Sequence, residues 1–315
     1  MNENTQTPFK YKDTTYYDLT HAAPMFEALD GDLTQPDLSR PIAGSEPVCS
    51  HGQGARISKA NHPAALGYFQ WGVFSLDEHF ATHIDSQCHF VTTDTDLQID
   101  NPDMRYAHEF TLEDLIGPLV YIDISDRVER ELAKNGGNPS PDLSVTDFSN
   151  SSNATVRLAD IEAVEQYITD GAYLVFNTGW ECTYGGEGPE NGWYHPYNNG
   201  LNHPGVTPEV VDWLVALEER KGIRINGLAA DNIAVESGDS LLGPGGSVDV
   251  QPARINGPYL HAVGLQRGWK LVENLANLNT LKGCPQGVGT LIVGASRIMG
   301  VSGSPARLIA MFPRN

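Results

Sequence analysis

Short apolar runs, separated by polar turns that contain glycine or proline, recur along the chain. Their length and their content of Val, Ile, Leu and aromatic residues are typical of buried β-strands. Five such runs predict strands over residues 119–124, 172–177, 223–230, 290–294 and 307–312. The frequency of glycine (32 residues) and proline (20 residues) also favours strands and turns over a helical bundle.

The spacing of apolar residues along one face predicts two helices. The first covers residues 155–169 and is followed by Gly171, which favours helix termination. The second begins at Thr207, an N-cap residue before Pro208, and ends near Gly222. Each helix leads into one of the predicted strands, so the pattern indicates a mixed α/β fold with flanking helices.

Three polar segments interrupt this pattern. Residues 1–15 predict a flexible N-terminal arm, residues 29–65 a long surface excursion, and residues 135–153 a surface insertion. All the predicted strands and helices lie outside these segments, which places the expected core in the rest of the chain.

The chain is strongly acidic, with 40 Asp and Glu residues against 20 Lys and Arg residues and a net charge of −20. This charge argues against nucleic acids and anionic membranes as partners, because basic patches bind both. No run approaches the roughly 18 apolar residues that span a bilayer, and residues 1–21 do not resemble a secretory signal. The cysteines are scattered, which predicts a reducing, cytoplasmic location; they are Cys49, Cys88, Cys182 and Cys284.

Three of the ten histidines fall within eleven residues, together with an aspartate: His79, His83, Asp85 and His89. Ligands of one metal ion must bring their donor atoms to within about 2.0–2.2 Å of it, so the backbone must let them converge. A straight strand would separate His79 from His83 by about 13 Å, whereas a helical turn places them about 6 Å apart. A continued helix would turn Asp85 to another face. The spacing therefore predicts a tight turn that enters an extended segment, with His89 beside the metal.

This segment resembles the signature His-x-Gly-Thr-His-x-Asp-x-Pro-x-His of the Putative cyclase family of metal-dependent hydrolases. That family includes bacterial kynurenine formamidases and isatin hydrolases. The matching residues are His79, Thr82, His83, Asp85 and His89. The sequence departs from the signature at Ala81, where the family usually has Gly, and at Gln87, where it usually has Pro. Neither departure removes an expected ligand.

Four further segments resemble the family, and the similarity extends from residue 16 to about residue 300. They are Asp18-Leu-Thr-His21, Asn177-Thr-Gly-Trp180, Pro204-Gly-Val-Thr207 and Gly227-Leu-Ala-Ala-Asp231. The resemblance implies one catalytic domain over residues 16–315 with a swivelling β/β/α-type fold. It also implies a homodimer or homotetramer, with neighbouring subunits near the pocket.

His261 precedes Glu273 by twelve residues. Spacing alone favours a structural role for both residues, in which His261 caps a helix and Glu273 pairs with Lys270 or Arg267. In the formamidases that the chain resembles, a His and a Glu at this spacing bind a second metal ion. The resemblance therefore implies that His261 and Glu273 are ligands, with Asp85 between the two ions. Whether one or two ions bind stays open, and Glu273 is also a candidate for proton transfer.

Aromatic residues near the motifs are candidates for a wall against a flat substrate. They are Trp71, Phe74 and, from its motif, Trp180. Buried aromatic residues more often serve packing, so these residues are weaker candidates than the histidines.

Nitrogen and oxygen ligands without cysteine suit Zn²⁺ or Mn²⁺. Either ion activates a water and polarises a carbonyl group, and His89 is then placed to act as general base and later as general acid. The resulting hypothesis is hydrolysis of an amide C–N bond in a small aromatic or cyclic substrate, either an isatin-like lactam or an N-formyl aryl amine. Two alternatives stay open: a lactone or ester hydrolase, and a non-catalytic protein that binds a metal or small ligand.

Overall fold

The computed structural model describes residues 8–20, 25–27, 55–64, 67–75, 78–134, 136, 148, 154–183, 202–238 and 258–314. For residues 25–27, 55–64 and 67–75 only the course of the backbone is described. No helix among the described residues has the length and apolar character that a membrane span requires.

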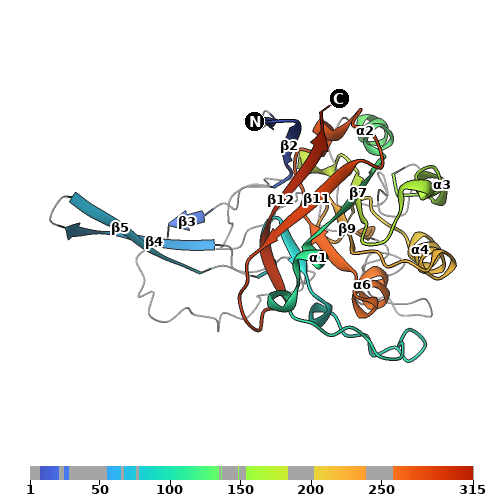
Figure 1. The fold of residues 1–315 in the computed structure, drawn as a ribbon, viewed down its shortest axis with the longest axis horizontal. Helices are drawn as coiled ribbons and strands as arrows, with labels where there is room; N and C mark the ends of the chain where they lie inside the picture. Colours follow the sequence, from blue (N-terminus) through green and yellow to red (C-terminus); the bar gives the residue numbers. More distant parts are fainter. Residues whose placement is uncertain are drawn as a thin grey trace.

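Nine strands of the described chain form one mixed sheet in the order β1-β2-β12-β11-β7-β8-β9-β10-β6. Strand β12 also pairs with β6, so the strands from β12 through β7 to β6 close into a barrel (Figure 1). Strands β7, β8, β9 and β10 run parallel to one another. The strands are β1 Phe9–Tyr11, β2 Thr14–Asp18, β6 His83–Asp85, β7 Ile116–Asp123, β8 Tyr173–Asn177, β9 Gly227–Ala230, β10 Lys270–Glu273, β11 Gly289–Ala295 and β12 Gly303–Pro313.

Helices cover one outer side of this barrel (Figure 1). The α-helices are α1 Leu112–Leu115, α2 Ser125–Lys134, α3 Leu158–Glu162, α4 Pro208–Lys221 and α6 Tyr259–Gly264. Short 3-10 turns join the elements: η1 Gln87–His89, η2 Ala107–Glu109, η3 Glu165–Tyr167, η4 Trp180–Thr183, η5 Leu265–Arg267 and η6 Leu278–Leu281.

The alternation of side chains along each strand divides the core in two. On β8, Tyr173 and Val175 belong to a cluster inside the barrel, whereas Leu174 and Phe176 pack beneath the helices. The same rule orients β6 and β10. Ile84 and Val272 face the barrel interior, so their neighbours His83, Asp85 and Glu273 face outward. On that side His261 of α6 approaches Asp85 and Glu273.

The five predicted strands are confirmed as β7, β8, β9, β11 and β12, with changes at their ends. The second predicted helix is confirmed as α4: Thr207 is its N-cap, Pro208 begins it, and Gly222 ends it in the left-handed conformation (φ 63°). The mixed α/β class with flanking helices is therefore confirmed. The more specific swivelling β/β/α assignment stays a prediction.

The first predicted helix is much shorter than expected. Helix α3 ends at Glu162, and Val164 leaves the helical conformation (φ −114°, ψ 3°) before the turn η3. Lys221 of α4 donates hydrogen bonds to the carbonyl oxygens of Glu165 and Ile168. A tertiary contact thus bonds the Glu165 carbonyl group, which a continuous helix would have paired with the backbone of Thr169.

Two segments expected to lie outside the core elements contain strands. Within the expected arm, β1 and the start of β2 pair with each other, and β2 continues the sheet along β12. Within the expected excursion, β4 (Ala55–Ala64) pairs with β5 (Gly67–Ser75) and with β3 (Met25–Glu27). This separate three-stranded sheet projects away from the barrel (Figure 1). Most of the expected insertion at 135–153 lies outside the described residues.

Candidate metal centre

The histidine motif forms a turn that leads into the short strand β6, as the spacing predicts. Ala81, in this turn, adopts a left-handed conformation with φ 57°. Its carbonyl oxygen accepts hydrogen bonds from His83 Nδ1 at 2.9 Å and from Asn274 Nδ2 at 3.0 Å. The turn conformation therefore fixes the orientation of the His83 ring.

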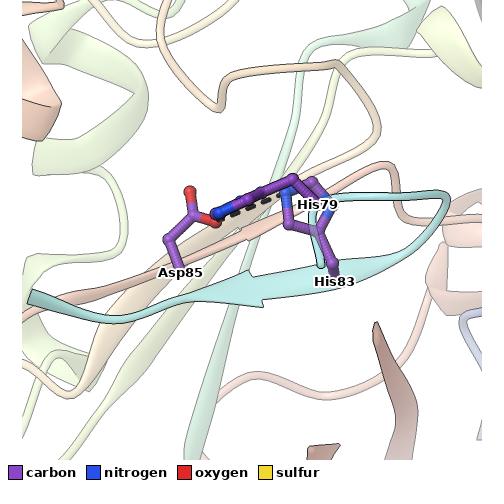
Figure 2. A group of neighbouring side chains, drawn as sticks. All are labelled: His79, His83 and Asp85. Carbon is purple, nitrogen blue, oxygen red and sulfur yellow. Dashed lines mark hydrogen bonds and ion pairs between the residues drawn. The ribbon is translucent and has the colours of Figure 1, made fainter. Parts of the chain in front are cut away.

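His79, His83 and Asp85 converge at one point (Figure 2). His79 Nδ1 lies 2.7 Å from Asp85 Oδ1, and His83 Nε2 lies 3.3 Å from the same oxygen. All three side chains are buried, with exposed fractions of 7%, 0% and 1%. The convergence expected from the sequence is confirmed.

His261 and Glu273 join this group from α6 and β10. Glu273 pairs with His83 across the two strands, and its Oε2 lies 3.3 Å from His83 Nε2. His261 Nε2 lies 3.6 Å from Glu273 Oε1 and 3.7 Å from Asp85 Oδ2. The alternative partners considered for Glu273 are engaged elsewhere: Lys270 with Asp114 and Arg267 with Glu218.

Three buried histidines belong to the cluster that His79, His83, Asp85, His261 and Glu273 form. Each of the three has one ring nitrogen in contact with a neighbour outside this cluster. His83 Nδ1 donates to the Ala81 carbonyl, and His261 Nδ1 lies 2.6 Å from Glu236 Oε1. His79 Nε2 lies 3.1 Å from Ser302 Oγ, whose hydroxyl donates to a carboxylate, that of Glu78. In the neutral rings this leaves the other nitrogen as a lone pair that faces the carboxylates.

Burial and these neighbours shift the pKa values of the cluster. Burial and the charge of Asp85 raise the pKa of Glu273. For Asp85, burial acts in the opposite direction, but four surrounding histidines hold its pKa well below the usual range. Burial also opposes protonation of His83 and His261, yet the carboxylates raise the pKa of His83 to about 9 and that of His261 well above its usual value. The site therefore favours positive charge among its carboxylates.

His89 lies at the edge of the cluster. Its ring packs against that of His79, with centroids 3.9 Å apart and a tilt of 36°. Burial, together with the neighbouring histidines, lowers the pKa of His89 to about 4, so its ring is neutral at pH 7. Its donor atom also lies within 4.8 Å of those of Asp85 and His261, so the geometry suits a ligand as well as a base.

The donor set fits a divalent cation. Ring nitrogens of three histidines face two buried carboxylates, and Asp85 Oδ2 makes no hydrogen bond within 3.5 Å to any described residue. Such an arrangement is costly without a positive charge at its centre, because buried charges require compensation. Nitrogen and oxygen donors of this kind suit Zn²⁺ or Mn²⁺.

The family model described as Putative cyclase matches residues 17–237, which is most of the chain. The chain belongs to the Putative cyclase family. A curated relative, the isatin hydrolase of Roseibium aggregatum, is 26% identical over 255 residues, covering 78% of this chain and 76% of that protein.

Solved isatin hydrolases share the fold of this cyclase-family chain. One, bound to the product analogue thioisatinate, has a TM-score of 0.59 at 21% identity and covers 96% of this chain and 94% of its own. Isatin hydrolase A from Ralstonia solanacearum has a TM-score of 0.58 at 21% identity, with coverage of 95% and 92%.

Sequence reasoning missed the residues that support the ligands of this cyclase-family site. Glu236, Ser302 and Glu78 hold histidine nitrogens directly or through one hydroxyl group. Gly303 leaves room for the His79 ring, since a Cβ there would lie 2.3 Å from His79 Cε1. Of these residues, only Glu78 adjoins a motif ligand in the sequence; the others become neighbours through the pairing of β12 with β6 and the packing of α6.

The three aromatic candidates differ in position. Trp180 has no exposed surface and packs against Phe148, with ring centroids 5.1 Å apart, so in this structure it is a core residue and not an open pocket wall. The backbone of Trp71 and Phe74 lies in β5 of the projecting sheet, and their side chains are outside the described residues.

Replacing Ala81 with glycine is expected to stabilise the protein by about 1 kcal/mol, because a left-handed conformation strains alanine but not glycine. The measurement is the midpoint of chemical unfolding, together with metal content, which should not fall. Ala229→Gly, at a buried residue of β9, is the matched control and should destabilise the protein. A loss of stability in Ala81→Gly equal to that of the control would contradict the strain argument.

Proposed function

We propose that the protein is a metal-dependent hydrolase that cleaves the amide C–N bond of an aromatic or cyclic amide, with an isatin-like lactam as the first candidate. One observation carries the proposal: three buried histidines, each anchored at one nitrogen, direct the other toward Asp85 and Glu273. Membership of the family and similarity to an isatin hydrolase support hydrolysis at this site.

The residues divide into ligands and a proton carrier. His79, His83 and Asp85 would hold a divalent ion, and His261 with Glu273 would complete its surroundings or hold a second ion. When bound, such an ion lowers the pKa of a water from about 15.7 to about 7 and polarises a carbonyl group. We assign the ion as Zn²⁺ or Mn²⁺.

His89 is the proposed general base and acid. Its neutral ring nitrogen takes a proton from the attacking water as the C–O bond forms. The same nitrogen then delivers that proton to the leaving nitrogen as the C–N bond breaks. Hydrolysis of a lactam in this way opens the ring and produces an amine and a carboxylic acid, which releases its proton to solvent at neutral pH. Glu273 would share in proton handling if it is not a ligand.

The test is hydrolysis by protein stripped with chelator and then reloaded with Zn²⁺ or Mn²⁺. The panel contains an isatin-type lactam, an N-formyl aryl amine and lactones matched in shape to the lactam. We expect metal-dependent turnover, with kcat/KM at least about tenfold higher for an amide than for its matched lactone. Preference for the lactone would favour an ester hydrolase. Binding without any turnover, detected as ligand-induced thermal stabilisation, would favour a non-catalytic protein.

We further propose that the protein is a cytoplasmic homo-oligomer, a dimer or tetramer. Cys88, Cys182 and Cys284 are free thiols, which suits a reducing compartment. The three-stranded sheet of β3, β4 and β5 projects from the barrel (Figure 1), and a sheet of this size needs an apolar face or a packing partner to be stable in water. Packing against another copy of the chain would supply that stability. Light scattering during size exclusion should give a multiple of the 34.3 kDa chain mass; a monomer would contradict the proposal.

A further inference from the structure

A buried carboxylate lies behind His261. Glu236 has no exposed surface, and its two oxygens contact consecutive residues of α6: Oε1 lies 2.6 Å from His261 Nδ1, and Oε2 accepts a hydrogen bond from the Leu260 backbone N–H at 3.1 Å. Glu236 therefore fixes both the start of the helix and the ring that the helix carries.

The turn that presents Glu236 is held in an unusual conformation. Val235 has φ 60°, which is rare for a β-branched residue and marks a strained backbone. Asn232 Oδ1 accepts a hydrogen bond from Val235 N at 2.6 Å, and Asn232 Nδ2 donates to the Pro204 carbonyl at 2.6 Å. A Cβ on Gly205 would lie 2.4 Å from the Glu236 backbone. Several contacts thus maintain strain at the residue next to Glu236, which is typical of functional positions.

We infer that Glu236 is a positioning residue that holds His261 with its proton on Nδ1 and directs Nε2 toward a bound divalent cation. The inference rests on the proposed function and concerns a residue outside the ligand set. His83 and His79 are anchored differently, by a backbone carbonyl and by a hydroxyl group. A carboxylate that accepts the proton of one imidazole nitrogen makes the other nitrogen a stronger electron-pair donor to a metal ion. Glu236 also adds negative charge to the His261 side of the site.

The test is metal affinity and not turnover. Zn²⁺ or Mn²⁺ is titrated into chelator-stripped full-length protein against a competing indicator. Glu236→Gln keeps the size of the side chain and removes its charge, so we expect affinity to fall by about 10- to 100-fold. The matched control is Glu218→Gln: Glu218 is also buried (3% exposed), but it bonds Ile225 N and Trp269 Nε1 and lies outside the cluster. The control should keep the wild-type affinity.

A double-mutant cycle identifies the route of the effect. In a His261→Ala background, Glu236→Gln should cause no further loss of affinity, because the ring that it positions is absent. An equal loss in both backgrounds, or an unchanged affinity in Glu236→Gln, would overturn the inference. If the wild-type protein binds neither ion, the proposed function fails first; if it binds and Glu236→Gln binds equally well, only the positioning role fails.

A second measurement needs no variant. Histidine side-chain ¹⁵N spectra of the Zn²⁺-loaded wild-type protein should show His261 with its proton on Nδ1. A proton on Nε2 would contradict the inference directly, whatever the folding of the variants.

Discussion

Removal of the His83 side chain should abolish both bound metal and hydrolysis. Its Nε2 lies 3.3 Å from Asp85 Oδ1 and 3.3 Å from Glu273 Oε2, so it joins the two carboxylates of the site. His83→Ala would leave these buried carboxylates with one fewer donor to share a cation. We expect metal content measured by mass spectrometry to fall close to zero and kcat/KM on the best amide to fall to background.

His89→Ala should separate chemistry from binding. If His89 moves the proton, its loss should lower kcat by about 10²- to 10⁴-fold while the metal content stays at the wild-type level. His108→Ala, at a histidine that contacts the Gly300 backbone away from the cluster, is the matched control and should retain both properties. Full activity in His83→Ala would contradict its role as a metal ligand, and full activity in His89→Ala would contradict its role in proton transfer. Loss of metal in His89→Ala would instead make His89 a ligand, which its position also suits.

The fold could be predicted where local pattern decides the structure. Strands β7, β8 and β9 have continuous apolar runs because they contribute to the core on both faces, whereas β11 and β12 bury mainly alternate residues. Thr207, Pro208 and Gly222 mark the ends of α4. The length of α3 could not be predicted, because Lys221 from another helix bonds carbonyl groups near its end. Closure of the barrel depends on the pairing of β12 with β6. These two strands lie far apart in the sequence, so no local pattern predicts that they pair.

The site, like the fold, has residues that local sequence predicts and residues that only tertiary packing brings together. His79, His83 and Asp85 lie within one turn and one strand, so their spacing alone limits the backbone conformations that let them converge. The contribution of His261 and Glu273 followed only from a family resemblance, because their spacing also fitted ordinary structural roles. The residues that anchor the ligands have no local sequence pattern that indicates this role. Ser302, for example, contacts His79 only because β12 pairs with β6.

Gly303→Ala should impair metal binding although Gly303 offers no ligand. Gly303 pairs with Asp85 between β12 and β6, and a Cβ there would lie 2.3 Å from His79 Cε1 and 2.7 Å from both ring nitrogens. Movement of the ring would disrupt its close contacts, because Nδ1 lies 2.7 Å from Asp85 Oδ1 and Nε2 lies 3.1 Å from Ser302 Oγ. We expect metal affinity, measured by competition with an indicator, to fall more than about tenfold, and stability to fall by about 1–3 kcal/mol.

The effect of this added methyl group should depend on the His79 ring. In a His79→Ala background the space is open, so Gly303→Ala should cause no further loss of metal affinity. Gly294→Ala, at a glycine of β11 whose Cβ would meet the Arg307 carbonyl at 3.0 Å, tests for a general effect on the sheet and should leave affinity unchanged. If Gly303→Ala weakened binding equally with and without the His79 ring, the cause would be a shift of β12 against β6. The geometry favours the ring, because all three of the closest atoms to the added Cβ belong to His79.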